Sequence, residues 1–327
     1  MLSFLHYLDD FAGASPPEFG PGPSPSKADF SRILELCKVL GIPLASDKTE
    51  FPSTLMIFLG FLIDTVNLTV SLPEEKRLSY LESIAKVMGK RSILCSELES
   101  LIGKLMHATE VIPIGRAFFR SLYDKVERRP KHIRSKTWIS LGADERLNLR
   151  WWQDLLRSWN GISLMRFVDW RPVFDLELAS DAALTDGYGI VVGNEWIAGK
   201  WPEDAPKNIA ILEAIPLVLV SLIWGYKWKG KCILFHTDNM AVKLSATSLL
   251  PKDPHLVFLM RELAMNSVRY DFRFEVEHVP GTDNTLADLL SRSRFDEFFA
   301  LHPNANPYPV NFDVDGLLKR LINYKAK

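Results

Sequence analysis

The order of strand-like and helix-like segments between residues 173 and 293 is the feature that most constrains the fold of this chain. Short β-branched and apolar runs bounded by glycine turns favour strands, and longer apolar runs favour helices. The pattern predicts strands at 173–180, 187–193 and 195–201, a helix at 208–226, a strand at 231–237, helical segments at 239–248 and 254–269, a strand at 272–279 and a short helix at 284–292. This βββ-α-β-α-β-α order predicts an α/β domain with a mixed five-stranded sheet and flanking helices.

Four acidic residues stand at places in this layout where a carboxylate is unfavourable. Asp181 and Asp238 end strands, Glu213 lies inside an apolar helix, and Asp288 lies between apolar residues on the short last helix. A carboxylate in such a run is costly unless it is paired or bound to a cation. Strand ends and helix turns can converge at one sheet edge, where oxygen ligands suit Mg²⁺ or Mn²⁺. Two such ions catalyse phosphodiester hydrolysis.

A simpler explanation exists for each of these residues taken alone. Any one acid is more often a cap, a turn residue or a solvated position, and Asp238-Asn239 and Asn284 could cap the helices that follow them. Four acids at coherent places in one layout favour the metal site.

Sequence motifs around these acids resemble those of type 1 RNase H domains. The motifs are Ser180-Asp181-Ala182-Ala183 followed by Gly187 and Gly189, the helix start at Asn208–Ala214, His236-Thr237-Asp238-Asn239, and His278–Arg292. The last is similar to the H-V-P-G-x-x-N-x-x-A-D-x-L-S-R ending of retrotransposon polyproteins. The resemblance implies an endonuclease that cleaves the RNA strand of RNA–DNA hybrids with two Mg²⁺ or Mn²⁺ ions. By resemblance, Asp181, Glu213, Asp238 and Asp288 are the catalytic and metal-binding residues, and Asn239 and Asn284 contact nucleic acid.

One position departs from the RNase H pattern. Many such domains carry a mobile histidine just after the position of Gly281, where this chain has Thr282-Asp283. His278 precedes the Pro-Gly pair instead. The departure suggests slower product release rather than an inactive site.

The N-terminal segment, residues 1–72, resembles part of a reverse-transcriptase palm. Tyr7-Leu8-Asp9-Asp10 predicts a hairpin with two acids at its tip, and a proline-rich loop and a helix at 28–40 follow. Thr54–Leu62 and Asn67–Leu72 predict a strand pair with a polar turn at Asp64. Together with Gly41–Glu50 and Phe58-Leu59-Gly60-Phe61, the Y-x-D-D motif is similar to the catalytic turn, the downstream lysine segment and the primer-grip hairpin of that family.

The sequence predicts a mainly helical region at 73–172. Two helices are expected to begin near Pro73 and Ser96, and two more to span 115–126 and 143–159. Leu101–Leu105 and Ile112–Arg116 resemble the thumb and connection of DIRS-type or gypsy-like retrotransposon polymerases. Trp151-Trp152 is expected in the core. A basic segment at 125–136 either contacts nucleic-acid phosphates or forms a solvated linker, and its candidate binding residues are Arg128, Arg129, Lys131 and Arg134.

The resemblance places a further metal-binding Asp of the polymerase, and the fingers, upstream of Y-x-D-D, and this chain begins shortly before Tyr7. Tyr7, Asp9 and Asp10 are therefore interpreted as a remnant of a polymerase site, and we expect no polymerase activity. Two alternatives remain: a catalytically silent remnant that binds nucleic acid or a protein, and a structural protein derived from such an element.

Composition and cysteine content limit the partners and the cellular compartment that we expect for this chain. The chain has 39 basic and 40 acidic residues, a balance that neither requires nor excludes a nucleic-acid partner. Three scattered cysteines favour free thiols in the cytoplasm or nucleus. The apolar stretch Ile209–Trp224 is shorter than the about 20 residues of a membrane span, so no membrane partner is expected. Residues 294–327 are expected to form a loosely ordered tail with a short helix near 314–324.

Overall fold

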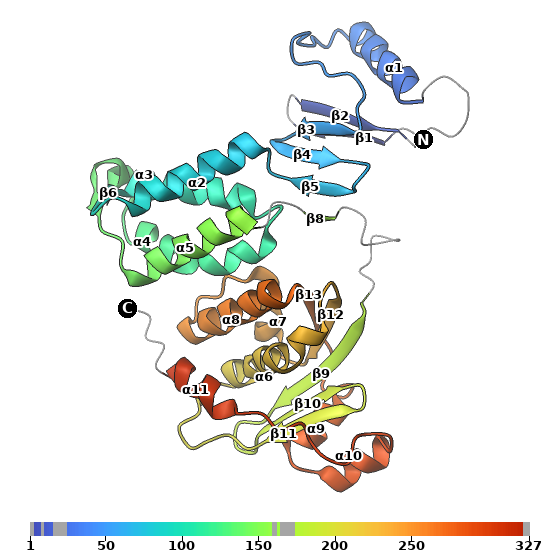
Figure 1. The fold of residues 1–327 in the computed structure, drawn as a ribbon, viewed down its shortest axis with the longest axis vertical. Helices are drawn as coiled ribbons and strands as arrows, with labels where there is room; N and C mark the ends of the chain where they lie inside the picture. Colours follow the sequence, from blue (N-terminus) through green and yellow to red (C-terminus); the bar gives the residue numbers. More distant parts are fainter. Residues whose placement is uncertain (1–2, 8–9, 16–24, 159–161, 164–173, 323–327) are drawn as a thin grey trace. The chain divides into compact units, whose positions relative to one another are not determined.

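The computed structural model describes residues 3–7, 10–15, 25–158, 162–163 and 174–322. These form two compact units, coloured along the sequence in Figure 1. The first holds the described residues up to Leu78 together with 162–163, and the second holds those from Ser79 to Ser158 and from 174 onward. The division after Leu78 falls inside helix α2 (Glu74–Met88), and the domain limits expected from the sequence stay predictions.

The first unit consists of a hairpin, a helix and a small sheet. Strand β1 (Ser3–Tyr7) pairs antiparallel with β2 (Asp10–Ala14), and helix α1 (Pro25–Val39) follows, as predicted for 28–40. The sheet has the order β3–β4–β5–β8, with strands at Leu55–Phe58, Phe61–Asp64, Thr69–Ser71 and Ile162–Ser163.

The strand expected at Thr54–Leu62 is two strands, β3 and β4. Leu59 and Gly60 have φ of 49° and 78°, a left-handed conformation that reverses the chain. The polar turn at Asp64 is confirmed, because its Oδ1 accepts hydrogen bonds from the backbone N–H groups of Val66 and Asn67, both at 2.9 Å.

The second unit begins with the helical region. Its elements are α2, β6 (Ile93–Leu94), α3 (Cys95–Ala108), η1 (Pro113–Phe118), α4 (Arg120–Glu127), η2 (Lys131–Lys136), β7 (Trp138–Ile139) and α5 (Ala143–Ser158). Trp152 is fully buried, and a Cβ on Gly115 would lie 2.3 Å from its ring. Trp151 stacks on Phe118 with the ring centroids 5.4 Å apart. The expectation of a core position is confirmed for Trp152, whereas Trp151 is only partly buried.

The rest of the second unit is built on a five-stranded mixed sheet with the order β11–β10–β9–β12–β13. The elements in chain order are β9 (Leu176–Ala182), β10 (Tyr188–Val192), β11 (Glu195–Gly199), α6 (Ile209–Trp224), η3 (Gly225–Lys227), β12 (Cys232–Thr237), α7 (Met240–Ser248), α8 (Pro254–Tyr270), β13 (Arg273–His278) and α9 (Thr285–Ser291). Strands β9, β10 and β11 pair antiparallel, while β12 is parallel to both β9 and β13. The predicted mixed α/β sheet with flanking helices is confirmed.

Helix α6 is apolar on all sides because it is a core helix of this domain. Ile209–Lys227 is long and apolar enough to cross a membrane by length and composition alone, but 72% of that segment is buried inside the fold. It packs against the sheet and against α8. Pro216 lies in the interior of the helix rather than in its first turn, so it donates no i→i−4 hydrogen bond to the carbonyl of Leu212.

The described part of the tail, up to residue 322, contains regular structure, which corrects the expectation of loose order there. It contains α10 (Phe295–Leu301) and α11 (Val314–Ile322), the second near the helix predicted at 314–324. Phe298 is fully buried, with its ring centroid 5.5 Å from that of Trp196. The Trp196 indole N–H donates to the carbonyl of Asn306 at 2.7 Å. Burial of aromatic side chains on β11 therefore holds the tail on the sheet.

Candidate metal centre

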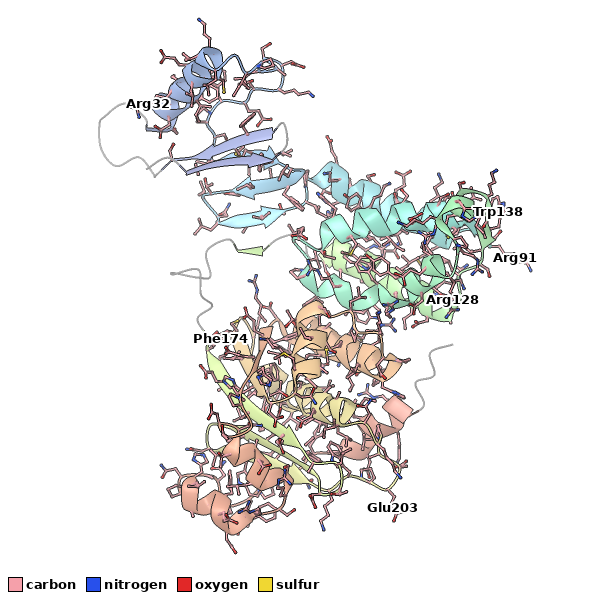
Figure 2. All side chains as sticks on the ribbon, turned by 180° about the vertical axis from the view of Figure 1, so that it is seen from behind. Arg32, Arg91, Arg128, Trp138, Phe174 and Glu203 are labelled. Atoms are coloured by element: carbon pink, nitrogen blue, oxygen red, sulfur yellow. The ribbon has the colours of Figure 1, made fainter. Side chains whose placement is uncertain are left out.

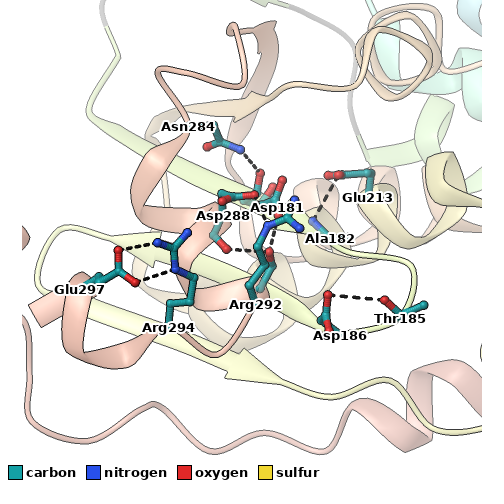
Figure 3. Close-up of polar contacts among 12 residues, drawn as sticks. Asp181, Ala182, Thr185, Asp186, Glu213, Asn284, Asp288, Arg292, Arg294 and Glu297 are labelled. Atoms are coloured by element: carbon teal, nitrogen blue, oxygen red, sulfur yellow. Dashed lines mark hydrogen bonds and ion pairs between the residues drawn. The ribbon is translucent and has the colours of Figure 1, made fainter.

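Three of the four predicted acids meet at one edge of the sheet. Strands β9 and β12 are parallel neighbours, so Asp181 near the end of β9 and Asp238 just after β12 lie at the same edge. Glu213, in the first turns of α6, faces them. One carboxylate oxygen from each of the three lies within 4.8 Å of the others. Figure 3 shows Asp181 and Glu213 on either side of the Ala182 amide.

Glu213 is held at this edge although its charge is unfavourable there. The residue is 3% exposed; its Oε1 accepts a hydrogen bond from the Ala182 N–H at 3.2 Å. Its Oε2 is buried and has no hydrogen-bond partner among the described residues. Burial raises the pKa of Glu213 to about 9, and the negative charges of Asp181 and Asp238 act in the same direction.

Asp181 is similarly constrained. It is 6% exposed, and burial raises its pKa, while a hydrogen bond from the hydroxyl of Ser291 opposes that rise. Two buried carboxylates and a third beside them repel one another when ionised, and a divalent cation removes that cost. The oxygen-only donor set and the unpartnered Oε2 of Glu213 fit a hard cation such as Mg²⁺ or Mn²⁺.

Asp288 lies next to this group but outside it. Its Oδ1 is 2.7 Å from Nε of Arg292, and its side chain is 34% exposed. Ser291 links it to the group, since the Ser291 hydroxyl lies against both the Asp181 carboxylate and the Asp288 carbonyl. The structure thus brings three predicted ligands together, whereas the fourth, Asp288, forms an ion pair on α9.

Gly189 explains how α9 reaches the site. It is the register partner of Asp181, and a Cβ at Gly189 would lie 2.3 Å from the carbonyl oxygen of Ala287 and 2.7 Å from the backbone N of Ser291. Only glycine therefore allows α9 to pack directly on β10. Asn284, just before α9, is 2% exposed and donates from Nδ2 to the carbonyl of Ser180 at 2.9 Å. These contacts position Asp288 and Ser291.

The other residues predicted to contact nucleic acid differ in exposure and in hydrogen bonding. Arg128 and Lys131 are exposed, and Figure 2 shows Arg128 at the surface of the helical region. Arg134 is instead paired with Glu99 at 2.6 Å and donates from Nε to the carbonyl of Arg129. The side chain of Asn239 caps α7, accepting hydrogen bonds from the backbone N of Ala241 and of Val242.

The structure also shows where residues of two other motifs lie. His278 has its ring Nε2 3.1 Å from the carbonyl oxygen of Asp238, so it contacts the backbone of a candidate ligand rather than its carboxylate. In the first unit, Tyr7 and Asp10 are register partners at the ends of β1 and β2. This agrees with the predicted hairpin, and Asp9 lies outside the described residues.

Two residues at this site were not singled out from the sequence. Ser291 holds Asp181 and Arg292 holds Asp288. Their signal was available, because they are the last two positions of the His278–Arg292 motif and follow Asp288 by one helical turn.

No protein-family model matches the chain, and no curated protein matches it. Among solved structures, the chain is similar to RNase H1 from the halophilic archaeon Halobacterium salinarum NRC-1, with a TM-score of 0.29 and 16% identity over 37% of this chain and 98% of that one. It is also similar to the foamy viral protease-reverse transcriptase in complex with RNA/DNA hybrid, with a TM-score of 0.32 and 11% identity over 89% of this chain. The match spans 58% of the foamy viral chain.

The five-stranded mixed sheet with its flanking helices is an α/β RNase H-like fold. Because both TM-scores are low, a functional proposal has to rest on the site itself.

Proposed function

We propose that residues 173–293 form a metal-dependent endonuclease that cleaves the RNA strand of RNA–DNA hybrids, leaving a 3′-hydroxyl and a 5′-phosphate. The observation that carries the proposal is the group of Asp181, Glu213 and Asp238, with its buried and unpartnered Glu213 oxygen. The motifs around these acids, and Asp288 on the adjacent helix, resemble the ligand set of type 1 RNase H domains.

In this proposal two of the ligands, Glu213 and Asp181, are each oriented by a hydrogen bond. The Ala182 N–H fixes one oxygen of Glu213 and leaves the other free, and the Ser291 hydroxyl fixes Asp181. Asp238 follows the end of β12 directly, and a Cβ on Gly281 would lie 3.4 Å from its Oδ2. Two bound Mg²⁺ or Mn²⁺ ions would supply the charge that activates a water and stabilises the leaving oxygen. Asp181, Glu213 and Asp238 would hold one ion, and Asp288 would join in holding the second.

Selectivity for the hybrid would come from 2′-hydroxyl contacts and groove shape rather than from base sequence. Arg128, Arg129, Lys131 and Arg134 remain candidates for phosphate contacts. Asn239 and Asn284 remain candidates for nucleic-acid contacts, with Asn284 2% exposed and bonded to Ser180. Of these, Arg128 and Lys131 are the most accessible.

The test is cleavage of four labelled substrates: the RNA–DNA hybrid, double-stranded RNA, double-stranded DNA and single-stranded RNA. We expect cuts in the RNA strand of the hybrid only, with Mg²⁺ or Mn²⁺ and not with EDTA. Equal cleavage of the hybrid and of single-stranded RNA would exclude the assignment. Hybrid binding without cleavage would favour the silent binding module.

We further propose that the chain derives from a DIRS-type or gypsy-like retroelement polymerase, acting in the cytoplasm or nucleus. Its Tyr7-Leu8-Asp9-Asp10 motif contains two acids, and the resemblance requires a third one upstream of them. We therefore expect this 327-residue chain on its own not to extend a primed template with Mg²⁺. Primer extension by the isolated chain would contradict this.

A further inference from the structure

Arg292 stands at the edge of the acidic cluster and binds the acid that is missing from the group of three. Its Nε lies 2.7 Å from Oδ1 of Asp288, one helical turn earlier. Figure 3 shows the Arg292 side chain beside both Asp288 and Asp181. The fourth predicted ligand is therefore already occupied by a cation that belongs to the chain.

The positive charge of Arg292 also acts on neighbouring acids. Its hydrogen bond and charge interaction with Asp288 raise its pKa, and the charges of Asp181 and Asp186 add to this. Arg292 thus partly neutralises the edge of the cluster where Asp288 lies, whereas Glu213 is left without a cationic partner in the structure described.

We propose that Arg292 is a positioning residue that holds Asp288 away from Asp181, Glu213 and Asp238, so that the two-ion site fills in two unequal steps. This inference rests on the proposed nuclease function. The first ion would take the preassembled group of three. The second requires Asp288, whose Oδ1 is held by Arg292.

The ion pair is suited to such an exchange because it is weak. The side chains of Arg292 and Asp288 are 51% and 34% exposed, and exposed pairs at i,i+4 spacing contribute little to stability. A divalent ion therefore competes with Arg292 for the carboxylate. A unit positive charge next to the second ion lowers its affinity by about tenfold in a solvated site.

The test is calorimetric titration of the metal-free protein with Mn²⁺, without substrate. We expect two steps for the wild type, the second weaker. Arg292→Gln should tighten the second step by about tenfold and leave the first within about twofold. Arg292→Lys keeps the charge and should keep the second step weak. The matched control is Arg320→Gln, which removes an arginine that is 52% exposed and paired with Glu262 at 3.0 Å, and it should bind like the wild type.

An independent readout is the Mg²⁺ concentration at half-maximal hybrid cleavage, which should fall in Arg292→Gln and return towards the wild-type value in Arg292→Lys. Two bound ions with the same second step in wild type and Arg292→Gln would overturn the inference and leave the nuclease proposal intact. Two ions bound in one step by the wild type would overturn it as well. No binding at all would overturn both.

Discussion

Replacing Glu213 by Gln should stabilise the metal-free protein in a pH-dependent way. The pKa of this carboxyl rises from 4.5 to about 9 on folding. Between these values the folded protein binds more protons than the unfolded chain, so the free energy of unfolding falls as pH rises, by about 1.4 kcal/mol per unit. From pH 5 to pH 8, Glu213 alone lowers it by about 4 kcal/mol. A neutral amide at the same position does not carry this cost.

The assay is urea unfolding in EDTA at pH 5, 6.5 and 8. Wild type and Glu213→Gln should be similar at pH 5, and the variant should be more stable at pH 8 by about 4 kcal/mol. Saturating Mg²⁺ should reverse the order at pH 8, because only the wild type keeps a full ligand set. Glu203→Gln, at an exposed loop position labelled in Figure 2, is the matched control and should show no pH-dependent difference from the wild type. A stability difference between Glu213→Gln and wild type that is equal at pH 5 and pH 8 would refute the reasoning.

Three further substitutions test how the site and the tail are held in place. Ser291→Ala removes the hydroxyl that lowers the pKa of Asp181, so the rising limb of the pH–rate profile should move to higher pH; an unchanged profile would contradict that role. Gly189→Ala places a Cβ 2.3 Å from the backbone of α9 and should cost about 1–3 kcal/mol of stability, with a larger loss of cleavage than of hybrid binding; a neutral effect in thermal unfolding would show that α9 is not seated there. Phe298→Ala, at a fully buried position, should cost about 3–5 kcal/mol in urea unfolding, whereas a loosely attached tail would lose almost nothing.

The sheet and three of its acids were predictable because local patterns carry them. Strand and helix periodicities in 176–291 are strong. An acid directly after a buried strand must lie at the sheet edge where that strand ends. Parallel pairing of β9 with β12 then brings Asp181 and Asp238 to one edge. Glu213 was detectable because a carboxylate inside an apolar helix is unfavourable without a partner.

Other features depend on contacts that a local pattern does not contain. Whether Asp288 faces the cluster or Arg292 is decided by side-chain rotamers on α9, which sequence spacing leaves open. The turn at Leu59-Gly60 interrupts an apolar run whose pattern predicts a single strand. The order of the tail depends on Trp196, about 100 positions away from Phe298 along the chain and 5.5 Å away in space.

The most direct test of the nuclease proposal is cleavage of a strand-labelled RNA–DNA hybrid with Mg²⁺ by wild type, Asp238→Asn and Asp253→Asn. Asp253 caps α8, where Asn serves equally well, so it is the matched control. The proposal predicts that wild type and Asp253→Asn cut the RNA strand at the same rate, and that Asp238→Asn is slower by at least about 100-fold. Equal cleavage by wild type and Asp238→Asn would contradict it.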